Sequence, residues 1–448
     1  MDLGAFINQC QRISESLITT DPEIIQGRLR DWTGRFSGTA SALVRPSNKT
    51  ELGLVMELAQ KYQVPLQAQG GNTSLVGGAT PIGHSAIVAT DHLDAIGPFD
   101  LSSHTITVGA GVTLAKLNQE LEPRGFRFGV DLASRASATL GAMLATNAGG
   151  IHVIGYGSMR NQVLGLSVVT PAFSTISRLD ALFKDNSGLD LVSIFSGSEG
   201  TLGIVSELVL RAVAIPKHRA VALLGFSDFA TAEVFARTLR QNRILSALEV
   251  MFDNGMELVE NYLSRQVPFR AKVYLLAEFE SQYSLIEHLT DIFSNLAETQ
   301  NAWAIEPAGC AQLWSWREAH TEAIARAGIA HKLDVALPLG RLAEFVSWIE
   351  SEFLPAYPGT STVLFGHLGD GNIHVNILGL EASDFECDEV ILSKAASLGG
   401  SISAEHGIGR AKVGFLSLTR SAADMAAMLG IKNAFDPDHI LNPGVLFA

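Results

Sequence analysis

The stretch VPLQAQGGNTSLVGG, residues 64–78, decides the fold. Its apolar first half predicts a strand that runs directly into a glycine-rich loop. Before it, SALVRP (41–46) predicts another strand, and Asn48 with Glu51 forms the capping box of an intervening helix. The buried face of that helix is predicted from the spacing of Leu52, Val55, Met56 and Ala59. A strand–helix–strand unit that opens onto glycines places backbone N–H groups at the end of a sheet, where they suit a phosphate.

Glycine-rich loops recur along the first half of the chain. Glycines allow positive φ and let a ligand approach the main chain closely, although an ordinary surface turn explains a single loop equally well. Two further clusters, ATLGAMLATNAGG (138–150) and GSEGTLGIVSE (197–207), favour a large dinucleotide. ITVGAGVTLAKLNQEL (106–121) looks like a nicotinamide fingerprint. However, Leu114 stands where a third glycine is needed for helix and strand to pack closely, so we do not expect a nicotinamide site.

Composition restricts the class of protein. The 448 residues are 47% hydrophobic and 17% charged, which predicts two or three globular domains rather than a disordered chain. The 32 Lys and Arg against 46 Asp and Glu residues give a net charge of −14, which disfavours nucleic acid as a partner. Three widely spaced cysteines, Cys10, Cys310 and Cys387, predict a reducing compartment without disulfides. With no basic leader and no apolar run of membrane-spanning length, we expect a soluble, cytoplasmic protein.

The order of predicted elements indicates two domains. Residues 1–215 contain N-terminal helices and then strands, helices and glycine loops. Residues 216–398 contain five strand-like runs, AVALLGF, ALEVMF, KVYLLAEFE, HKLDVALP and STVLFGHL, separated by helical stretches such as SQYSLIEHLTDIFSNLAET and LAEFVSWIESEF. This pattern suits an α+β domain with helices on one face of its sheet, and we expect that sheet to be largely antiparallel. Residues 399–448 are glycine-rich again, and we expect them to return to the first domain and close the same site.

A pair of histidines in GHLGDGNIHVNIL predicts a metal site. The dipeptide Asp370-Gly371 is a strong type I′ hairpin signal, and with it as a two-residue turn His367 and His374 would face each other across two strands. Glu405 in SAEHGIGR would supply a third ligand, and two histidines with one carboxylate suit catalytic zinc or non-haem iron. Two histidines that merely stack or hydrogen-bond in a sheet are the alternative.

Six motifs occur in order along the chain: PSNKTELGLVMELAQKYQVPLQAQGGNTSLVGGATP, ATLGAMLATNAGG, GSEGTLGIVSE, GHLGDGNIHVNIL, SAEHGIGR and DPDHILNPG. Together they resemble the FAD-linked 2-hydroxyacid dehydrogenases of the vanillyl-alcohol oxidase type (PCMH-type) fold, from about residue 40 onward. The members closest in pattern are the D-2-hydroxyglutarate and D-lactate dehydrogenases. The resemblance implies an oxidoreductase with an FAD-binding domain and a substrate domain.

The resemblance also places FAD. It implies that the pyrophosphate lies on the first glycine loop, that the second cluster lines the middle of the cofactor, that the third meets its adenine end, and that a C-terminal asparagine sits near the isoalloxazine. The residues concerned are Gly70, Gly71, Asn72, Thr73, Ser74, Gly78, Asp131, Ser137, Thr139, Gly141, Asn147, Gly150, Gly203, Ile204 and Asn442. Some relatives tether FAD through a histidine at the place of Asn72, so we expect non-covalent FAD here.

For the second domain, the resemblance implies a divalent ion on His367, His374 and Glu405, with Asn376 and His406 beside it as catalytic residues. Zinc is the first candidate, and manganese and iron also accept such ligands. In the mechanism that follows, the ion binds the 2-hydroxyl and 1-carboxylate of the substrate, His406 takes the hydroxyl proton, and the C2 hydride passes to flavin N5. Because adjacent Glu405 and His406 cannot point the same way in a strand, we expect the loop to bend there.

Substrate choice should depend on cations. LWSWREAHTEAIARAG predicts one helix that ends at Gly328 and carries Arg317 and Thr321 on one face, and Lys332 begins the next strand. Taken alone, Arg317 could pair with a neighbouring glutamate on the helix, and Lys332 could be an ordinary strand-edge charge. The resemblance implies that these three residues, with Asn376, bind a dicarboxylate, because a guanidinium and an ammonium suit a second carboxylate that lactate and glycolate lack.

These observations predict an FAD- and metal-dependent dehydrogenase of D-2-hydroxyglutarate or a close dicarboxylate such as D-malate. The same chemistry on D-lactate or glycolate is the nearest alternative, and a non-catalytic flavoprotein subunit of an electron-transfer complex is a third. Relatives of this type pass electrons to an electron-transfer flavoprotein or a quinone, and a homodimer is compatible with the pattern. One departure is TPAFSTISRLDALFKDN (170–186), which lacks the glycine-rich hairpin of the family, so we expect a shortened hairpin.

Overall fold

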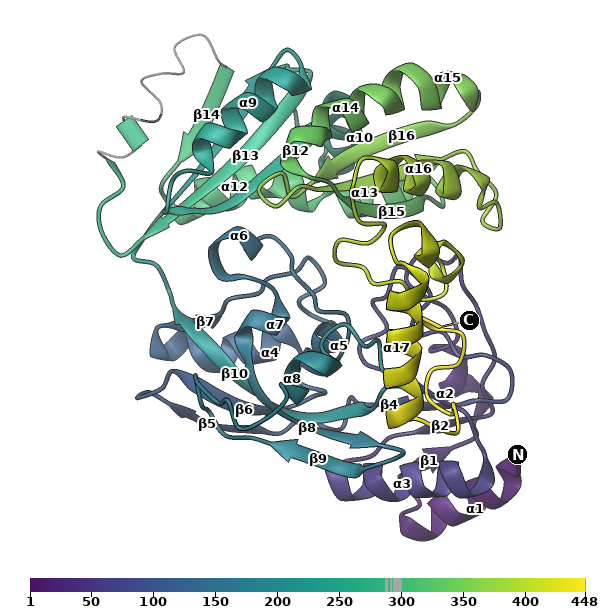
Figure 1. Cartoon of the computed structure of the whole chain (residues 1–448). Helices are drawn as coiled ribbons and strands as arrows, with labels where there is room; N and C mark the ends of the chain where they lie inside the picture. Colours follow the sequence, from purple (N-terminus) through teal and green to yellow (C-terminus); the bar gives the residue numbers. More distant parts are fainter. Residues whose placement is uncertain (287–288, 291, 293–299, 448) are drawn as a thin grey trace. The chain divides into compact units, whose positions relative to one another are not determined.

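The computed structural model describes residues 1–286, 289–290, 292 and 300–447, and the chain forms two compact units (Figure 1). The first unit comprises Met1–Gly149, Gly157–Ile215 and Glu405–Ala448, and the second comprises Gly150–Tyr156 and Pro216–Ala404. The chain therefore leaves the first unit twice and returns to it twice. Among the described residues, no helix combines the length and the apolar character needed to cross a lipid bilayer.

A small mixed sheet lies at the start of the first unit. Its strand order is β1 (Ile18–Thr19), β2 (Ala42–Val44), β4 (Ala86–Ala89) and β3 (Leu66–Gln69), with β2 and β3 parallel to β4. Its helices are α1 (Leu3–Ile13), α2 (Pro22–Gln26) and α3 (Lys49–Tyr62). Asn48 caps α3 as predicted, because its side chain accepts the N–H of Glu51 at 2.9 Å, but the Glu51 carboxylate accepts the N–H of Ser47 at 2.8 Å and not that of Asn48, so only half of the predicted capping box is confirmed. The four predicted core residues of α3 are also buried in one cluster with the sheet.

The second sheet of the first unit is antiparallel. Its strand order is β5 (Ile96–Asp100), β6 (Thr105–Gly109), β10 (Ile204–Ala214), β8 (Val163–Thr170) and β9 (Ser174–Arg178), and β7 (Phe126–Phe128) also pairs with β10. The helical segments of this part are α4 (Leu114–Leu121), η1 (Glu122–Arg124), α5 (Leu140–Ala145), α7 (Met159–Gln162) and α8 (Leu191–Phe195). The segment without family glycines still forms a hairpin, since β9 follows β8 and pairs with it.

The C-terminal part of the first unit contains η4 (Val413–Leu418) and α17 (Ala422–Phe435). Lys432, near the end of α17, is buried, contacts the Asp436 carboxylate and donates to the carbonyl oxygens of Thr201 at 2.8 Å and Leu441 at 3.0 Å. Leu441 also forms a parallel bridge with Leu66. These contacts bring the LNPG segment beside β3, the strand that leads into the first glycine loop.

The sheet of the second unit has seven strands, and every neighbouring pair is antiparallel. The strand order is β14 (Gln300–Ala304), β11 (His218–Phe226), β13 (Val273–Ser281), β12 (Leu245–Phe252), β16 (Ser361–Gly366), β17 (Asn372–Leu378) and β15 (His331–Ala336). The predicted antiparallel sheet is therefore confirmed. Apolar residues of one sheet face pack against α10, α12 and α13 in one core cluster.

The second unit also contains a set of helices and helical turns. They are α6 (Val153–Tyr156), α9 (Phe229–Leu239), α10 (Asp253–Leu263), α12 (Pro307–Glu318), α13 (His320–Ala327), η2 (Leu339–Arg341), α14 (Leu342–Trp348), the π-helical turn η3 (Ile349–Phe353), α15 (Leu354–Ala356) and α16 (Glu386–Ser397). The helix expected in SQYSLIEHLTDIFSNLAET (281–299) lies largely outside the described residues.

The single helix predicted over LWSWREAHTEAIARAG is wrong, because the structure has two helices, α12 and α13, that meet at Ala319. Nδ1 of His320 lies 2.9 Å from the carbonyl oxygen of Trp316, the group that would accept the N–H of residue 320 in a continuous helix. A side chain that takes a backbone acceptor in this way competes with the helix. Arg317 and Thr321 therefore lie on different helices.

Two short segments differ from the expected division of the chain. Residues 399–404 group with the second unit, because Ser401 and Ser403 form bridges to β15. Residues 150–156 also group with the second unit, where His152 bonds to a glutamate of β13.

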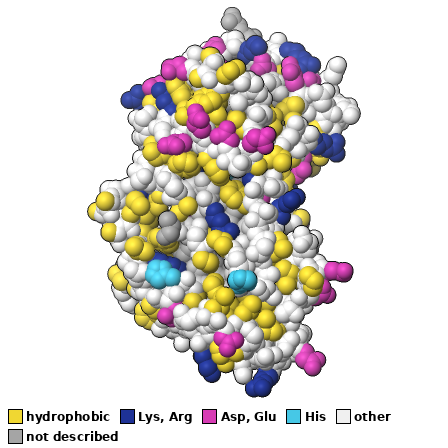
Figure 2. Space-filling view, turned by 90° about the vertical axis from the view of Figure 1, so that its right-hand side faces the viewer, with side chains coloured by type: hydrophobic (Ala, Val, Ile, Leu, Met, Phe, Trp, Pro, Cys, Tyr) yellow, Lys and Arg dark blue, Asp and Glu magenta, His cyan; other side chains and the backbone are white. Residues whose placement is uncertain are grey.

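On the face drawn in Figure 2, acidic and basic side chains are interspersed, and no broad basic area of the kind that binds nucleic acid is visible.

Candidate active site

A cavity of about 540 Å³ lies in the first unit, at the end of β3. It is lined by Ile24, Gly27, Arg28, Gln69, Gly70, Gly71, Asn72, Asp91, Asp94, Gly111, Thr113, Lys116, Ser137 and Thr139. A Cβ at Gly70 would overlap the Thr139 hydroxyl, and a Cβ at Gly71 would overlap the carbonyl oxygen of Ser137. The close packing of the first glycine loop on the second cluster therefore requires glycine at both positions.

Two polar atoms at this cavity are buried without a hydrogen-bond partner among the described residues: Oδ1 of Asn72 and Oγ1 of Thr139. Asn72 has a φ of 54° and donates through Nδ2 to the carbonyl oxygen of Arg30 at 2.8 Å. A buried polar atom without a partner costs about 1–3 kcal/mol, so both atoms fit a site for a polar ligand. The predicted cofactor residues that line this cavity are Gly70, Gly71, Asn72, Ser137 and Thr139.

Two other predicted cofactor residues hold the loops together. Oδ1 of Asn147 accepts three hydrogen bonds of 3.0 to 3.1 Å, from the hydroxyls of Ser158 and Ser196 and from the backbone N–H of Arg160. Oδ1 of Asn442 accepts a β3 backbone N–H at 2.7 Å, while its Nδ2 donates to the carbonyl oxygen of Glu199 at 2.6 Å. Both amides are thus engaged by the protein itself, and any contact with the cofactor stays a prediction.

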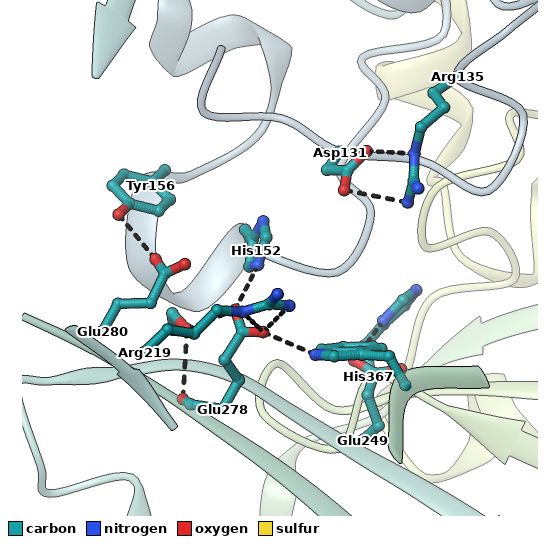
Figure 3. A network of polar contacts seen from close by, with 11 residues as sticks. Asp131, Arg135, His152, Tyr156, Arg219, Glu249, Glu278, Glu280 and His367 are labelled. Atoms are coloured by element: carbon teal, nitrogen blue, oxygen red, sulfur yellow. Dashed lines mark hydrogen bonds and ion pairs between the residues drawn. The ribbon is translucent and has the colours of Figure 1, made fainter. Parts of the chain in front are cut away.

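The remaining predicted cofactor residues are spread over the same loops. Oγ of Ser74 accepts the N–H groups of Val76 and Gly78 at 3.3 and 3.2 Å, which closes the first loop. Asp131 forms an ion pair with Arg135, with Oδ1 and Nε 3.0 Å apart (Figure 3). Their roles, and those of the other loop members, stay predictions; these others are Thr73, Gly141, Gly150, Gly203 and Ile204.

The SAEHGIGR loop is held by a buried carboxylate of the third glycine cluster. Oε1 and Oε2 of Glu199 accept the N–H groups of Ile408 and Gly409, both at 2.8 Å. Burial raises the pKa of Glu199 against the opposing effect of these two hydrogen bonds. The chain bends at residues 404–406, as expected, and Oε1 of Glu405 lies 3.7 Å from Nε2 of His406.

In the second unit, polar side chains form a row across β15 and β17. Lys332 faces Asn376, with Nζ and Oδ1 3.3 Å apart, and burial lowers the pKa of Lys332 to about 8. Asp334 faces His374, with Oδ1 and Nδ1 3.6 Å apart. The other oxygen of Asp334 accepts the N–H of Ala404 at 3.1 Å, one residue before Glu405 in the chain. All four facing side chains are buried.

The predicted register of the histidine hairpin is wrong by two residues. His374 pairs with Phe365 and not with His367, because β16 ends at Gly366 and the turn comprises residues 367–371. A type I′ turn needs positive φ at both central residues, but of Asp370-Gly371 only Gly371 has it, at 86°. A slip of two residues keeps each side chain on its sheet face. The two imidazoles therefore still meet, with ring centroids 5.2 Å apart.

Arg317 does not pair with a neighbouring glutamate of its helix. Its Nε donates to Oε2 of Glu249 at 2.6 Å, and its guanidinium lies over the Phe365 ring at 4.5 Å. Oε1 of Glu249 lies 2.8 Å from Nδ1 of His367. Burial alone would raise the pKa of Glu249, but the charges of His367 and Arg317 hold it below its usual range. Thr321, the third predicted substrate residue, is partly buried on α13.

A second carboxylate on the same sheet has similar partners (Figure 3). Glu278 of β13 accepts hydrogen bonds from Nε of Arg219 at 2.7 Å and Nε1 of Trp314 at 2.6 Å. It also bonds to Nε2 of His152 at 2.8 Å and to a serine hydroxyl of β12 at 2.9 Å. Although the group includes potential metal ligands, the carboxylate of Glu278 is occupied by protein donors on both oxygens.

Sequence reasoning missed four buried carboxylates with several protein partners: Glu199, Glu249, Glu278 and Asp334. Three of them stand in the middle of the apolar runs ALEVMF, KVYLLAEFE and HKLDVALP. A charged residue in a buried strand is rare unless it is paired, so its position was itself a signal of a partner. The identity of the partner could not be inferred, because it depends on strand order.

A glycine-lined cavity with unpartnered polar atoms in one unit, and a buried sheet face with histidines and cations in the other, are compatible with an FAD-dependent oxidoreductase, the class that the family matches show. Residues 40–179 match the family described as FAD binding domain, and residues 215–446 match FAD linked oxidases, C-terminal domain. The chain belongs to this family of FAD-linked oxidases.

Comparison with known proteins refines the class. The chain is 36% identical over 454 residues to a D-2-hydroxyglutarate dehydrogenase of Xanthomonas citri pv. viticola, with 98% of this chain and 95% of the relative covered. It is 34% identical over 448 residues to the mitochondrial D-2-hydroxyglutarate dehydrogenase of Bos taurus, with 97% and 81% covered. In fold it is similar to an alkyldihydroxyacetonephosphate synthase, with a TM-score of 0.77, 18% identity and 98% and 84% covered. The predicted two-domain PCMH-type fold and FAD-dependent 2-hydroxyacid dehydrogenase class are confirmed.

Proposed function

We propose that this protein oxidises a D-2-hydroxy dicarboxylic acid, with D-2-hydroxyglutarate to 2-oxoglutarate as the leading reaction and D-malate as a second candidate substrate. The observation that carries the proposal is the burial of two cations, Arg317 and Lys332, in the unit that holds His367 and His374; their exposed fractions are 7% and 8%. Arg317 already pairs with Glu249, and the charge of Glu322 acts on Lys332; the second carboxylate of a dicarboxylate substrate would give both cations a further anionic partner.

The state of Lys332 supports a dianionic substrate. Burial lowers its pKa to about 8, so the protein destabilises the ammonium relative to water. A carboxylate placed at this ammonium would stabilise the charged form again. Arg317 uses Nε for Glu249, which directs its two terminal nitrogens to serve a planar carboxylate as a fork. Lactate and glycolate have no second carboxylate for these groups.

The donor set of the second unit fits a divalent metal ion. Ligating histidines usually direct their second ring nitrogen to a carboxylate. Here Nδ1 of His367 bonds to Glu249, which leaves Nε2 of that ring for a ligand, and Nδ1 of His374 lies 3.6 Å from Oδ1 of Asp334, beyond hydrogen-bond distance. We infer that these two histidines hold the ion, zinc being the first candidate and manganese and iron the others; Glu405 as the third ligand stays a prediction from the sequence.

Bound FAD would supply an acceptor, at N5, for the hydride from C2 of the substrate, and a divalent ion held by the histidines would supply Lewis acidity toward the 2-hydroxyl. The chain's own residues do the rest. His406 accepts the hydroxyl proton, since an imidazole has a pKa near neutral pH, and Asn376 orients the reacting end of the substrate. Arg317, Thr321 and Lys332 bind the distal carboxylate, so that C2 is held in one position.

Two further features complete the proposal. FAD binds without a covalent link, because Asn72, at the place where some relatives carry a tethering histidine, has no nucleophilic nitrogen at neutral pH. An electron-transfer flavoprotein or a quinone would serve as the electron acceptor of the reduced enzyme. Because the FAD is not covalently bound in this proposal, unfolding of the purified yellow protein in acid should release the flavin into the supernatant.

The decisive experiment measures anaerobic bleaching of the flavin by D-2-hydroxyglutarate, D-malate and D-lactate. We expect efficient bleaching by the dicarboxylates, and Lys332→Ala should reduce their kcat/KM by about 10- to 100-fold, the value of a charged hydrogen bond. The control is Lys272→Ala, since Lys272 is an exposed lysine of the same unit, paired with Asp253. Equal losses on D-lactate and D-2-hydroxyglutarate in Lys332→Ala would refute the role of Lys332.

A further inference from the structure

We propose that Glu249 is a positioning residue that couples Arg317 to His367, so that substrate recognition and metal binding depend on one buried carboxylate. This inference rests on the proposed function, which assigns Arg317 to the substrate and His367 to the metal. Glu249 itself would touch neither ligand. It acts through the two side chains that do.

The geometry of Glu249 carries the argument. It stands in the middle of β12, has no exposed surface and is flanked by apolar residues. Its two oxygens are divided between two partners: Oε1 lies 2.8 Å from Nδ1 of His367, and Oε2 lies 2.6 Å from Nε of Arg317. Because an unpaired charge at such a depth is very costly, the carboxylate constrains both partners strongly.

The first consequence concerns the histidine. An ionised carboxylate can only accept hydrogen bonds, so Nδ1 of His367 must carry a proton when it bonds to Glu249. The lone pair of the neutral ring is then at Nε2, the atom that remains for a metal ion. A carboxylate at the second nitrogen also fixes the ring orientation and makes the ligating nitrogen more basic.

The second consequence concerns the arginine. The guanidinium is fixed at one end by Glu249 and on one face by the Phe365 ring, 4.5 Å away. With Nε engaged, the terminal nitrogens of Arg317 are presented in a defined plane, as bidentate binding of a carboxylate requires. Loss of Glu249 would let the guanidinium rotate and would leave its charge without this partner.

The same sheet offers a matched control. Glu278 also joins an arginine to a histidine, but its histidine, His152, belongs to the segment 150–156 and has no assigned role in metal binding. Glu278→Gln removes a buried negative charge of the same kind from the neighbouring strand. His152→Gln is a milder control, because it leaves the pairing of Glu278 with Arg219 intact.

The test uses the full-length flavoprotein and measures zinc affinity by competition with a chromophoric chelator, together with KM for D-2-hydroxyglutarate. In Glu249→Gln we expect zinc to bind about 10- to 100-fold more weakly, as for other residues that support a metal ligand, and KM to rise. Glu249→Asp keeps the charge that Arg317 needs, yet its shorter side chain cannot reach both partners, so zinc affinity should also fall. Both controls should bind zinc as the wild type does.

Folding is monitored by the melting temperature and by the spectrum of the bound flavin, which reports on the first unit. Zinc affinity within twofold of the wild type in either folded Glu249 variant would overturn the inference, as would an equal loss in the Glu278 and His152 controls. A wild-type protein that binds no divalent metal would overturn the proposed function, and this inference with it. Normal metal binding in the wild type and in Glu249→Gln would overturn the inference alone.

Discussion

Two buried carboxylates on neighbouring strands of the second unit have similar kinds of partner but differ in the number of hydrogen bonds that they accept. Glu249 and Glu278 each join one arginine to one histidine. Glu278 also accepts hydrogen bonds from Trp314 and from a serine, whereas each oxygen of Glu249 has one partner among the described residues. A carboxylate offers about four acceptor sites. The fuller set around Glu278 makes a closed structural network, whereas the sparser set around Glu249 is compatible with the ligand-binding roles proposed for its partners.

The largest effect that this comparison predicts separates the two histidines. His367→Ala should lower kcat on D-2-hydroxyglutarate by about a thousandfold, because the proposed metal ion would lower the activation barrier by several kcal/mol. His152→Ala should leave kcat within threefold but lower the free energy of unfolding by about 1–3 kcal/mol, since it removes a buried hydrogen bond to Glu278. Anaerobic flavin reduction and urea unfolding measure the two quantities.

Metal removal provides the control for this pair. Dialysis of the wild type against a chelator should reproduce the kinetic defect of His367→Ala, and zinc should restore the activity of the wild type but not of the variant. If both histidine variants lose activity to the same extent, the distinction between the two networks is wrong.

The next effect separates the two arginines. In Arg317→Lys we expect KM for D-2-hydroxyglutarate to rise about 10- to 100-fold, because an ammonium cannot bond to Glu249 and also present a fork to the substrate. Arg219→Lys should change KM by less than threefold, since the Arg219 side chain is 37% exposed and Glu278 keeps its other donors. Steady-state kinetics with D-lactate, which lacks the distal carboxylate, is the control. A comparable rise of KM for D-lactate in Arg317→Lys would contradict the assigned role.

A smaller effect should appear in the pH profile. Burial lowers the pKa of Lys332 to about 8, so the side chain is charged below this pH and loses its proton as the pH rises through it. We therefore expect kcat/KM for D-2-hydroxyglutarate to fall above pH 8 by up to about tenfold per unit, while the value for D-lactate stays nearly constant. Lys332→Met should abolish the difference between the two profiles. Parallel profiles in the wild type would show that Lys332 does not contact the substrate.

The smallest effect concerns Glu199 of the first unit, a third buried carboxylate with two partners, both of them backbone N–H groups. Glu199→Gln keeps one acceptor oxygen and loses the other, so the free energy of unfolding should fall by about 1–2 kcal/mol. The dissociation constant of FAD, measured by fluorescence, should rise, because the loop held by Glu199 belongs to the same unit as the glycine-lined cavity. Unchanged stability and FAD affinity would mean that the loop is held by other contacts.

Much of the fold was predictable because its signals are local. The cap of α3 depends on a side chain three residues from its partner, and the antiparallel strands of the second unit follow from apolar runs of suitable length. The histidine pair was predicted from a two-residue hairpin turn at Asp370-Gly371, and the pair survives because a register error of two residues keeps each side chain on its sheet face. The break between α12 and α13 was missed, because it depends on where the His320 imidazole finds its hydrogen bond.

The sequence by itself determined the family, the glycines that line the cavity, and the sheet face that carries His367 and His374. These features follow from local backbone freedom, from residue spacing and from motifs that occur in order. Only the tertiary structure decided which carboxylate supports which histidine. Glu249 and His367 are 118 residues apart, and their contact exists because β12 pairs with β16, a choice of strand neighbours that no local pattern specifies.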